Sequence, residues 1–342
     1  MKKTIIMALL MASSLHTVSA QNIIDVHSHV VSPSYLDALT RHDALLEEGF
    51  PLPQWSVESQ LKFMDEAGVK TSVLTLAAPQ PYFGDIRESR SVVRQLNEEA
   101  ARIKSEYPDR FLWCATLPLP DVNAAIEEAR YALDTLHADG IKLATNVRGQ
   151  YLGAPELDPL MAFLNERHAV VVLHPHKPEP INEQVMAQTP LAMQEYLSET
   201  TRAVANMISR NVPARYSNLK IIVPHCGAYL PIAIPRMKSL TPVMQQAKLV
   251  GAIDWEKNLA PFYYDLSGSH SLEAVRLLLT ITSPDRLLYG SDFPYVAPHV
   301  LTGGLQRMKD YLSSAPDLQP YKEMILWKNA QKLFGKGTPH SK

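Results

Sequence analysis

The sequence predicts an α/β fold, a (β/α)8 TIM-type barrel, from three observations. Eight short apolar runs of strand type alternate with amphipathic helical stretches after residue 20. Strands that alternate with helices favour a parallel sheet, and eight such units over about 320 residues favour a barrel. No glycine-rich dinucleotide motif follows the first run, which counts against the alternative, a doubly wound open sheet.

The elements are expected at definite positions. The strands are expected, in order, at Ile23–His29, Thr71–Leu76, Phe111–Leu117, Gly140–Ala144, Ala169–His174, Lys220–His225, Phe262–Leu266 and Arg286–Gly290. Apolar residues recur at helical spacing between them, and this pattern predicts helices at Val92–Tyr107, Ala124–Leu136, Asp158–Arg167 and Leu272–Thr280.

Three connections are long for a barrel: Val30–Glu58, Lys177–Thr200 and Gly227–Pro261. Each follows an expected strand, so each lies on the C-terminal face, where barrels build their active sites. Long loops in compact domains are usually functional. We therefore expect these segments to form a lid over a site.

Composition excludes several classes of protein. The chain has 342 residues, 33 Lys+Arg against 35 Asp+Glu, and 46% apolar residues, which is ordinary globular composition. With a formal charge of -2 there is no basic surplus, so no nucleic-acid partner is expected. No apolar run after the N-terminal segment is long enough to span a bilayer.

Residues 1–20 have the pattern of a signal peptide. Lys2 and Lys3 precede a mostly apolar stretch, and Val18-Ser19-Ala20 offers small residues for cleavage. The alternative is a buried first helix. We expect an exported protein, periplasmic or secreted, with a single domain at 21–342. Its two cysteines, Cys114 and Cys226, lie in apolar stretches and are expected to be buried thiols without a disulfide.

Four motifs carry the chemistry, each at the end of an expected strand. They are Asp25-Val26-His27-Ser28-His29, Leu173-His174-Pro175-His176, Val223-Pro224-His225-Cys226-Gly227 and Gly290-Ser291-Asp292-Phe293-Pro294. Any one is a weak signal, because a lone strand histidine is more often a core residue. Together they place several imidazoles and one carboxylate on one face of a barrel. Such donors suit Zn²⁺ or another first-row divalent ion.

In this order the motifs resemble the amidohydrolase superfamily, and more narrowly its branch of aminocarboxymuconate-semialdehyde decarboxylases and aromatic acid decarboxylases. Leu117–Val122 and Thr201–Val204 are most similar to the 6-methylsalicylate decarboxylases. The resemblance implies metal ligands His27, His29, His174 and Asp292. It implies His225 as acid/base beside the metal, with Asp292 as an alternative proton donor, and it suggests a homodimer.

The implied function is metal-dependent, non-oxidative decarboxylation of a small aromatic hydroxy acid of the 6-methylsalicylate type. The cofactor is one divalent ion, Zn²⁺ before Mn²⁺. The same metal with bound water would suit the alternative, hydrolysis of a lactone or amide, and the export signal favours that alternative. A carbamylated Lys142 beside a second metal would favour it too, although a structural lysine is the plainer interpretation. A third hypothesis is a metal-dependent protein that binds a sugar or another ligand and has lost catalysis.

Other residues are candidates for the substrate, an aromatic carboxylate. Arg148 and Arg202 could fork onto its carboxylate, and Phe293 and Tyr295 could stack on its ring. His176, where the branch often has Trp or Thr, lines the pocket, binds metal in another arrangement or faces solvent. Asp265 either orients a ligand histidine or caps the following helix.

Overall fold

The computed structural model describes residues 22–182, 184–185, 189–268 and 271–335, so the expected signal peptide at 1–20 lies outside the described residues. The strands of the main sheet run in the order β1-β2-β3-β4-β7-β8-β9-β10, and every pair is parallel. They are β1 Ile23–His29, β2 Val69–Thr75, β3 Phe111–Ala115, β4 Gly140–Ala144, β7 Val170–His174, β8 Lys220–Val223, β9 Phe262–Asp265 and β10 Leu287–Leu288. All eight expected strands are present.

The two edges of the sheet meet through the segment that follows β10. The backbone N–H of Val26 donates to Tyr289 O (2.9 Å), and those of His29 and Asp292 donate to Phe293 O and His27 O (both 2.8 Å). The buried Asp25 carboxylate accepts from Ser291 N (2.9 Å) and Oγ (2.6 Å). These bonds nearly close the barrel and confirm the predicted fold class.

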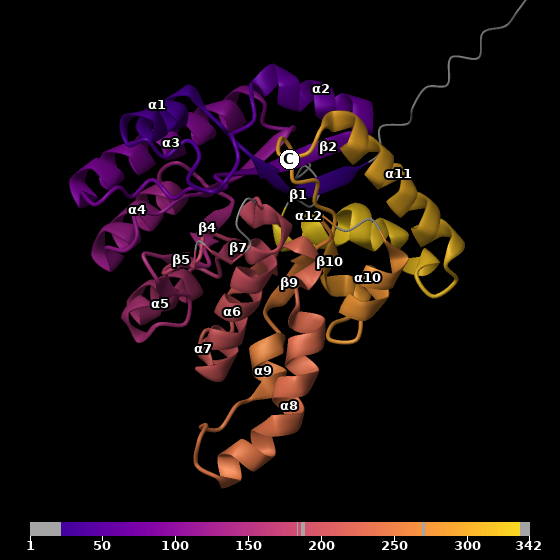
Figure 1. Ribbon diagram of the computed structural model, residues 1–342. Helices are drawn as coiled ribbons and strands as arrows, with labels where there is room; N and C mark the ends of the chain where they lie inside the picture. The colour runs from indigo at the N-terminus through magenta and orange to yellow at the C-terminus, as the bar shows by residue number, and fades with distance from the viewer. Residues whose placement is uncertain (1–21, 183, 186–188, 269–270, 336–342) are drawn as a thin grey trace, which may run out of the picture.

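Helices surround the sheet as an outer layer (Figure 1). They are α1 Pro33–Arg41, α2 Val57–Ala67, α3 Ile86–Glu106, α4 Val122–Asp134, α5 Asp158–Glu166, α6 Glu195–Ser209, α7 Val212–Arg215, α8 Leu230–Gln246, α9 Trp255–Leu259, α10 Leu272–Leu278, α11 Pro298–Ser314 and α12 Asn329–Leu333. A small antiparallel hairpin, β5 Asn146–Val147 and β6 Gln150–Tyr151, follows β4. Local chemistry sets several boundaries: Ser56 and Ser59 form a capping box on α2, and Gly68 ends it in the left-handed conformation.

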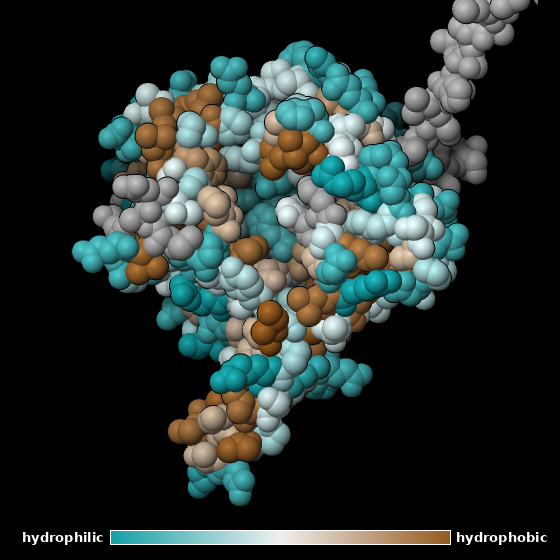
Figure 2. Space-filling view, turned by 45° about the vertical axis from the view of Figure 1, so that its right-hand side comes forward, coloured by the Kyte–Doolittle hydropathy of each residue, from teal (hydrophilic) through white to brown (hydrophobic). Residues whose placement is uncertain are grey.

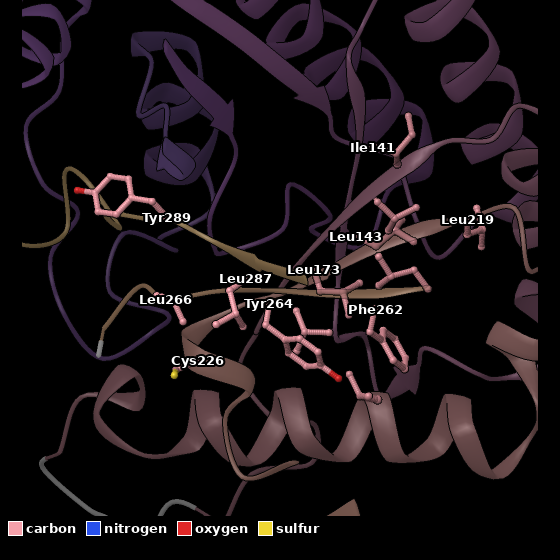
Figure 3. Packing of buried hydrophobic residues seen from close by; sticks show 14 of the residues in the cluster. Ile141, Leu143, Leu173, Leu219, Cys226, Phe262, Tyr264, Leu266, Leu287 and Tyr289 are labelled. Carbon is pink, nitrogen blue, oxygen red and sulfur yellow. The ribbon is translucent and has the colours of Figure 1, made fainter. Parts of the chain in front are cut away.

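Alternating side chains divide the strands between two cores. Outward residues such as Ile141, Leu143, Leu173 and Phe262 pack in one cluster with the helices (Figure 3). Inward residues fill the barrel interior: Val26, Val73, Leu112, Cys114, Val170, Val172, Ile222 and Leu288. Cys114 and Cys226 are buried and form no disulfide, as expected. The interior is therefore a packed core, and the site lies above it, at the carboxyl ends of the strands.

A bulge in β1 turns two neighbouring side chains inward. Asp25 pairs with Ser72 and Ser28 with Leu74, so β1 has one extra residue over this stretch. Val26 therefore belongs to the barrel interior while His27, the next residue, reaches the site with His29. Alternation alone would have placed Val26 and His27 on opposite faces.

The three long connections all contribute to the site face. Val30–Glu58 holds α1 and begins α2, Lys177–Thr200 holds the 3₁₀ turn Leu191–Met193, and Gly227–Pro261 holds α8 and α9. In the last connection, α8 and the segment that follows it extend away from the barrel as an arm, and apolar residues gather at the tip of this arm (Figures 1 and 2). Closure of these segments as a lid stays a prediction. Among the described residues, no helix combines the length and apolarity that crossing a membrane requires.

Candidate metal centre

Four predicted side chains converge at the carboxyl end of the barrel. His27, His174, His225 and Asp292 each offer one ligand atom, and these atoms lie within 4.8 Å of one another. The residues come from the ends of β1 and β7 and from the segments just after β8 and β10. Four donors this close, with three imidazoles and one carboxylate, form a set that a first-row divalent ion prefers.

His29, the fourth predicted ligand residue, lies against this group. Its Nε2 is 3.1 Å from Asp292 Oδ1, and its ring centroid is 4.8 Å from that of His27. Its Nδ1 is 3.0 Å from Thr75 Oγ1 on β2. The residues implied as ligands are thus together, and the tightest group has His225, expected as acid/base, where His29 was expected.

Asp265, at the end of β9, orients two members of the group. Its Oδ2 accepts from His27 Nδ1 (2.9 Å), and its Oδ1 accepts from the backbone N–H of His225 (3.1 Å). Ser267 Oγ donates to the same carboxylate (2.6 Å). Of its two expected roles the structure supports the first, since Ser271 and not Asp265 caps α10.

The ligand histidines use one ring nitrogen for a hydrogen bond to a neighbour, and the other is left for an ion. In the neutral form that can bind an ion, His27 donates from Nδ1 to Asp265 and carries a lone pair on Nε2, a buried atom with no hydrogen-bond partner among the described residues. His174 Nδ1 likewise donates to Pro175 O (2.9 Å), which leaves its Nε2 as an acceptor. Buried nitrogens without partners cost free energy unless something binds them. A metal ion fits that position.

Burial and neighbouring charges set the protonation of the group. Burial opposes ionisation of Asp292, but the hydrogen bond with His29 and the charge on His27 lower its pKa to about 2. Burial also opposes protonation of His27, yet the Asp265 carboxylate raises its pKa to about 9. Burial lowers the pKa of the other histidines of the site, which are His29, His174 and His225. Only His27 would therefore release a proton when an ion binds.

Unusual backbone conformations hold these side chains in place. β8 ends two residues before its predicted end, because Pro224 has no N–H for the ladder and His225 adopts a left-handed φ of 56°. Asp292 is also left-handed, with φ of 68°. At Gly290 a Cβ would lie 2.8 Å from His27 Cβ, so only glycine lets the segment after β10 approach the ligand. Strained residues of this kind cluster at functional sites.

A cavity of 610 Å³ opens onto the group. His174, His225 and Asp292 line it, and Ser267 lines it beside them. Most of the remaining wall is apolar, and includes Phe50, Met193, Leu197, Pro231, Leu277 and Val296. Tyr295, expected to contact the substrate, lines the cavity; its ring centroid is 5.4 Å from that of His29, and its buried Oη has no partner among the described residues.

The structure does not bring the other expected substrate residues to the cavity wall. Arg148 pairs with Glu179 (3.5 Å), and Arg202 bonds to Glu199 and Tyr151; both arginines are more than half exposed. Two neighbouring acidic side chains thus hold the guanidinium groups away from the cavity. Phe293 is buried and stacks on the ring of Phe63 of α2, with centroids 4.6 Å apart.

His176 lies in none of the three places expected for it. It is buried outside the cavity lining, and its Nε2 accepts from the N–H of Gln80 (3.2 Å). The same nitrogen is 3.3 Å from Glu48 Oε1. Burial raises the pKa of Glu48 to about 7, despite the hydrogen bond from Tyr196. The single lone pair of Nε2 is taken by Gln80, so His176 and Glu48 are buried neighbours behind the wall, and the contacts of His176 are structural.

Lys142 has a structural partner. Its buried Nζ donates to Ala77 O (2.8 Å), and burial lowers its pKa to about 7. Within the described ranges only one group of three or more metal-ligating side chains occurs, the one described above. The geometry therefore favours the plainer interpretation of this lysine.

Several residues that build the site were not predicted from the sequence. Thr75 holds His29, Tyr196 lines the cavity, and Tyr196 Oη donates to Glu48 Oε2 (2.9 Å). Phe50 and Met193 come from long connections whose paths no local pattern predicts. Ser267 alone had a usable signal, because it follows Asp265 by two residues on a strand end.

Comparison with known proteins agrees with this geometry. The chain is 35% identical to decarboxylase yanB of Aspergillus niger over 328 residues, covering 91% of this chain and 87% of the relative. It is 32% identical to 6-methylsalicylic acid decarboxylase of Penicillium expansum, covering 81% and 86%. A structure of 5-carboxyvanillate decarboxylase from Novosphingobium aromaticivorans, with bound manganese, has the same fold: the TM-score is 0.79 at 19% identity, over 92% of this chain and 97% of that chain.

The family model described as amidohydrolase matches residues 24–336, which include every strand of the barrel and every residue of the metal centre. The match begins at the strand that holds His27 and His29, and it ends beyond α12. The chain therefore belongs to the amidohydrolase family.

Proposed function

We propose that this protein is a metal-dependent carboxy-lyase that removes CO₂ from a small aromatic hydroxy acid of the 6-methylsalicylate type. The observation that carries the proposal is the group of three imidazoles and one carboxylate within 4.8 Å, at the wall of a largely apolar cavity. The relatives described as decarboxylases favour this reaction over hydrolysis.

The reaction leaves an electron pair on a ring carbon. His27, His174 and Asp292, with His29 beside Asp292, would hold a divalent ion, and His225, the remaining member of the close group, would stay free to act as a base. The ion would supply positive charge for the substrate carboxylate and for the charge that develops on the ring. Neutral His225, whose Nε2 is 4.0 Å from Asp292 Oδ2, accepts the proton of the ortho hydroxyl and delivers it to the ring carbon. The bond between ring and carboxylate breaks, CO₂ leaves, and the phenolate takes a proton from water.

The cavity wall supports such a substrate. No lysine or arginine is among the described residues that line it, so the metal centre is the position that can neutralise a carboxylate. The apolar wall and Tyr295 favour a ring over a flexible polar chain.

Activity is expected to depend on the metal. Removing the ion with a chelator should abolish CO₂ release from 6-methylsalicylate, and adding back Zn²⁺ or Mn²⁺ should restore it. Released CO₂ and ring absorbance are measured together with metal content. Protein that holds one ion per chain, yet releases no CO₂ from 6-methylsalicylate, salicylate or 2,6-dihydroxybenzoate, would overturn the proposal; lactones and amides would then be tested for hydrolysis.

For the identity of the ion we propose that the site binds Zn²⁺ more tightly than Mn²⁺ and that the protein is active with either ion. Affinity for a given nitrogen and oxygen site is higher for Zn²⁺ than for Mn²⁺. The bound manganese of the distant 5-carboxyvanillate decarboxylase structure supports the second ion. Competition between the two ions, followed by elemental analysis of the protein, should give a Zn²⁺-loaded sample; a Mn²⁺-loaded sample would reverse the order.

We propose further that the mature chain begins at Gln21 and works outside the cytoplasm. Support comes from the two lysines, the apolar stretch and the small residues of 1–20. Fractionation of cells that make the whole chain, with mass spectrometry of the purified product, should find a protein without residues 1–20 in the exported fraction. A cytoplasmic product that retains them would contradict export.

We also propose a homodimer that buries the tip of the α8 arm. Val243 and Leu249 are exposed apolar residues there, together with Leu240 and Val250. Exposed apolar patches on soluble proteins often mark contact surfaces. Sedimentation should give twice the chain mass, and Val243→Lys with Leu249→Lys should give one chain mass. A wild-type monomer at micromolar concentration would overturn this assignment.

A further inference from the structure

The cavity is larger than a 6-methylsalicylate requires. Its volume is 610 Å³. A benzene ring with a carboxylate, a hydroxyl and a methyl group has about 11 non-hydrogen atoms, which take up roughly 330 Å³ even at the ~30 Å³ that a water molecule takes up in the liquid. Nearly half of the cavity would stay unfilled by such a substrate.

The unfilled part is apolar. Apart from the hydroxyl groups of Tyr196 and Tyr295, the polar side chains of the wall are close together: His174, His225 and Asp292 form the metal centre, and Ser267 bonds to the Asp265 carboxylate behind it. Away from that group the wall consists largely of aliphatic and aromatic side chains, with no lysine or arginine among the described lining residues. A second charged group there would lose its hydration without gaining an oppositely charged partner, whereas a hydrocarbon chain has no such hydration to lose.

Two apolar side chains at the mouth are exposed where they would be covered by a longer ligand. Met193, on the 3₁₀ turn Leu191–Met193, is 70% exposed, and Leu277, on α10, is 45% exposed. Both line the cavity although they come from different connections. Leu197 and Pro231 add further apolar surface to the wall. A hydrocarbon chain that leaves the ring toward the mouth would remove these surfaces from water.

We propose that the preferred substrate is a salicylate whose position 6 carries an alkyl chain of about five carbons or more in place of the methyl group. This inference rests on the proposed decarboxylation and names the substrate class for it. The carboxylate and hydroxyl bind at the metal centre, and the chain lies along Leu197, Pro231 and Leu277 toward the mouth. Each methylene that becomes buried should raise kcat/KM about fourfold, until the chain reaches solvent.

The test compares chain lengths on the metal-loaded protein. We would measure kcat/KM for CO₂ release from salicylates with a methyl, propyl or pentyl group at position 6, and from one with a carboxymethyl group there. We expect kcat/KM for the pentyl compound to be at least tenfold higher than for the methyl compound. We expect kcat/KM for the carboxymethyl compound to be at least tenfold lower than for the methyl compound. Turnover of the methyl compound with no gain for pentyl would overturn the inference alone. No CO₂ from any compound, at one ion per chain, would overturn the decarboxylation with it.

A pair of variants locates the effect. Leu277→Gln replaces an apolar residue of the mouth, and Ile232→Gln replaces a 66% exposed apolar residue of α8 that does not line the cavity. The first should lower the ratio of pentyl to methyl kcat/KM about threefold or more, and the second should leave this ratio unchanged. Equal ratios in both variants would place the alkyl chain elsewhere and overturn the assigned path.

Discussion

Asp292→Asn is expected to lower kcat for CO₂ release from 6-methylsalicylate by about a thousandfold or more, because it removes the single carboxylate of the metal centre. Asp292 belongs to the group within 4.8 Å and accepts a hydrogen bond at 3.1 Å from His29. The amide has no charge to offset that of the ion. Loss of one acid/base or charge-stabilising group typically costs a hundredfold to ten-thousandfold in rate.

Asparagine is the informative replacement at this position. Asp292 has a left-handed backbone, with φ of 68°, and asparagine adopts that conformation more readily than most residues. The barrel should therefore fold, which circular dichroism checks. Asp85→Asn, at the exposed N-cap of α3, is the matched control, since asparagine caps helices as well as aspartate does. If Asp292→Asn kept a tenth of the wild-type kcat at saturating metal, Asp292 would have no essential role.

The second large effect is expected from a residue that does not contact the metal position. Asp265→Asn should weaken metal binding by about tenfold to a hundredfold, the usual effect of removing a partner that orients a ligand histidine. Asp265 Oδ2 accepts from His27 Nδ1 at 2.9 Å. An amide nitrogen at that position would donate instead, so His27 would hold its proton on Nε2, the atom that must bind the ion.

Metal titration by calorimetry separates this effect from a loss of fold. At saturating metal, Asp265→Asn should recover much of the wild-type kcat, whereas Asp292→Asn should not. Asp254→Asn, at the exposed N-cap of α9, provides the control substitution. An unchanged metal affinity in Asp265→Asn would show that another contact, such as Ser267 Oγ at 3.1 Å from His27 Nδ1, is enough to orient the ring.

The barrel was predictable because its signals are local. Each buried strand is a short apolar run, and amphipathic helices between the runs enforce parallel pairing. The predicted strands Ile23–His29 and Gly140–Ala144 coincide with β1 and β4. The last strand is shorter than predicted. It was expected at Arg286–Gly290, but β10 is limited to Leu287–Leu288, because the residues after it bond to β1 and to Asp25 instead of continuing the ladder.

The metal centre was predictable for a related reason. Strand ends of a parallel barrel meet on one face, so histidines and a carboxylate at those ends come together whatever the loops do. The bulge that turns both Val26 and His27 inward has no such signal, since it depends on the pairing of Asp25 and Ser28 with β2. The same holds for Asp265, whose role was open until His27 was placed 2.9 Å from it.

By itself the sequence determined the barrel, the strand ends that carry His27, His29, His174 and Asp292, and the family, because these depend on patterns within one strand or one motif. Only the tertiary structure decided which residues form the cavity. Arginines are long and exposed, so Arg148 and Arg202 pair with nearby glutamates, and no pattern in their segments reveals it. Phe50, Met193 and Leu277 reach the cavity from separate connections, and such contacts arise when the chain packs, not from the order of its residues.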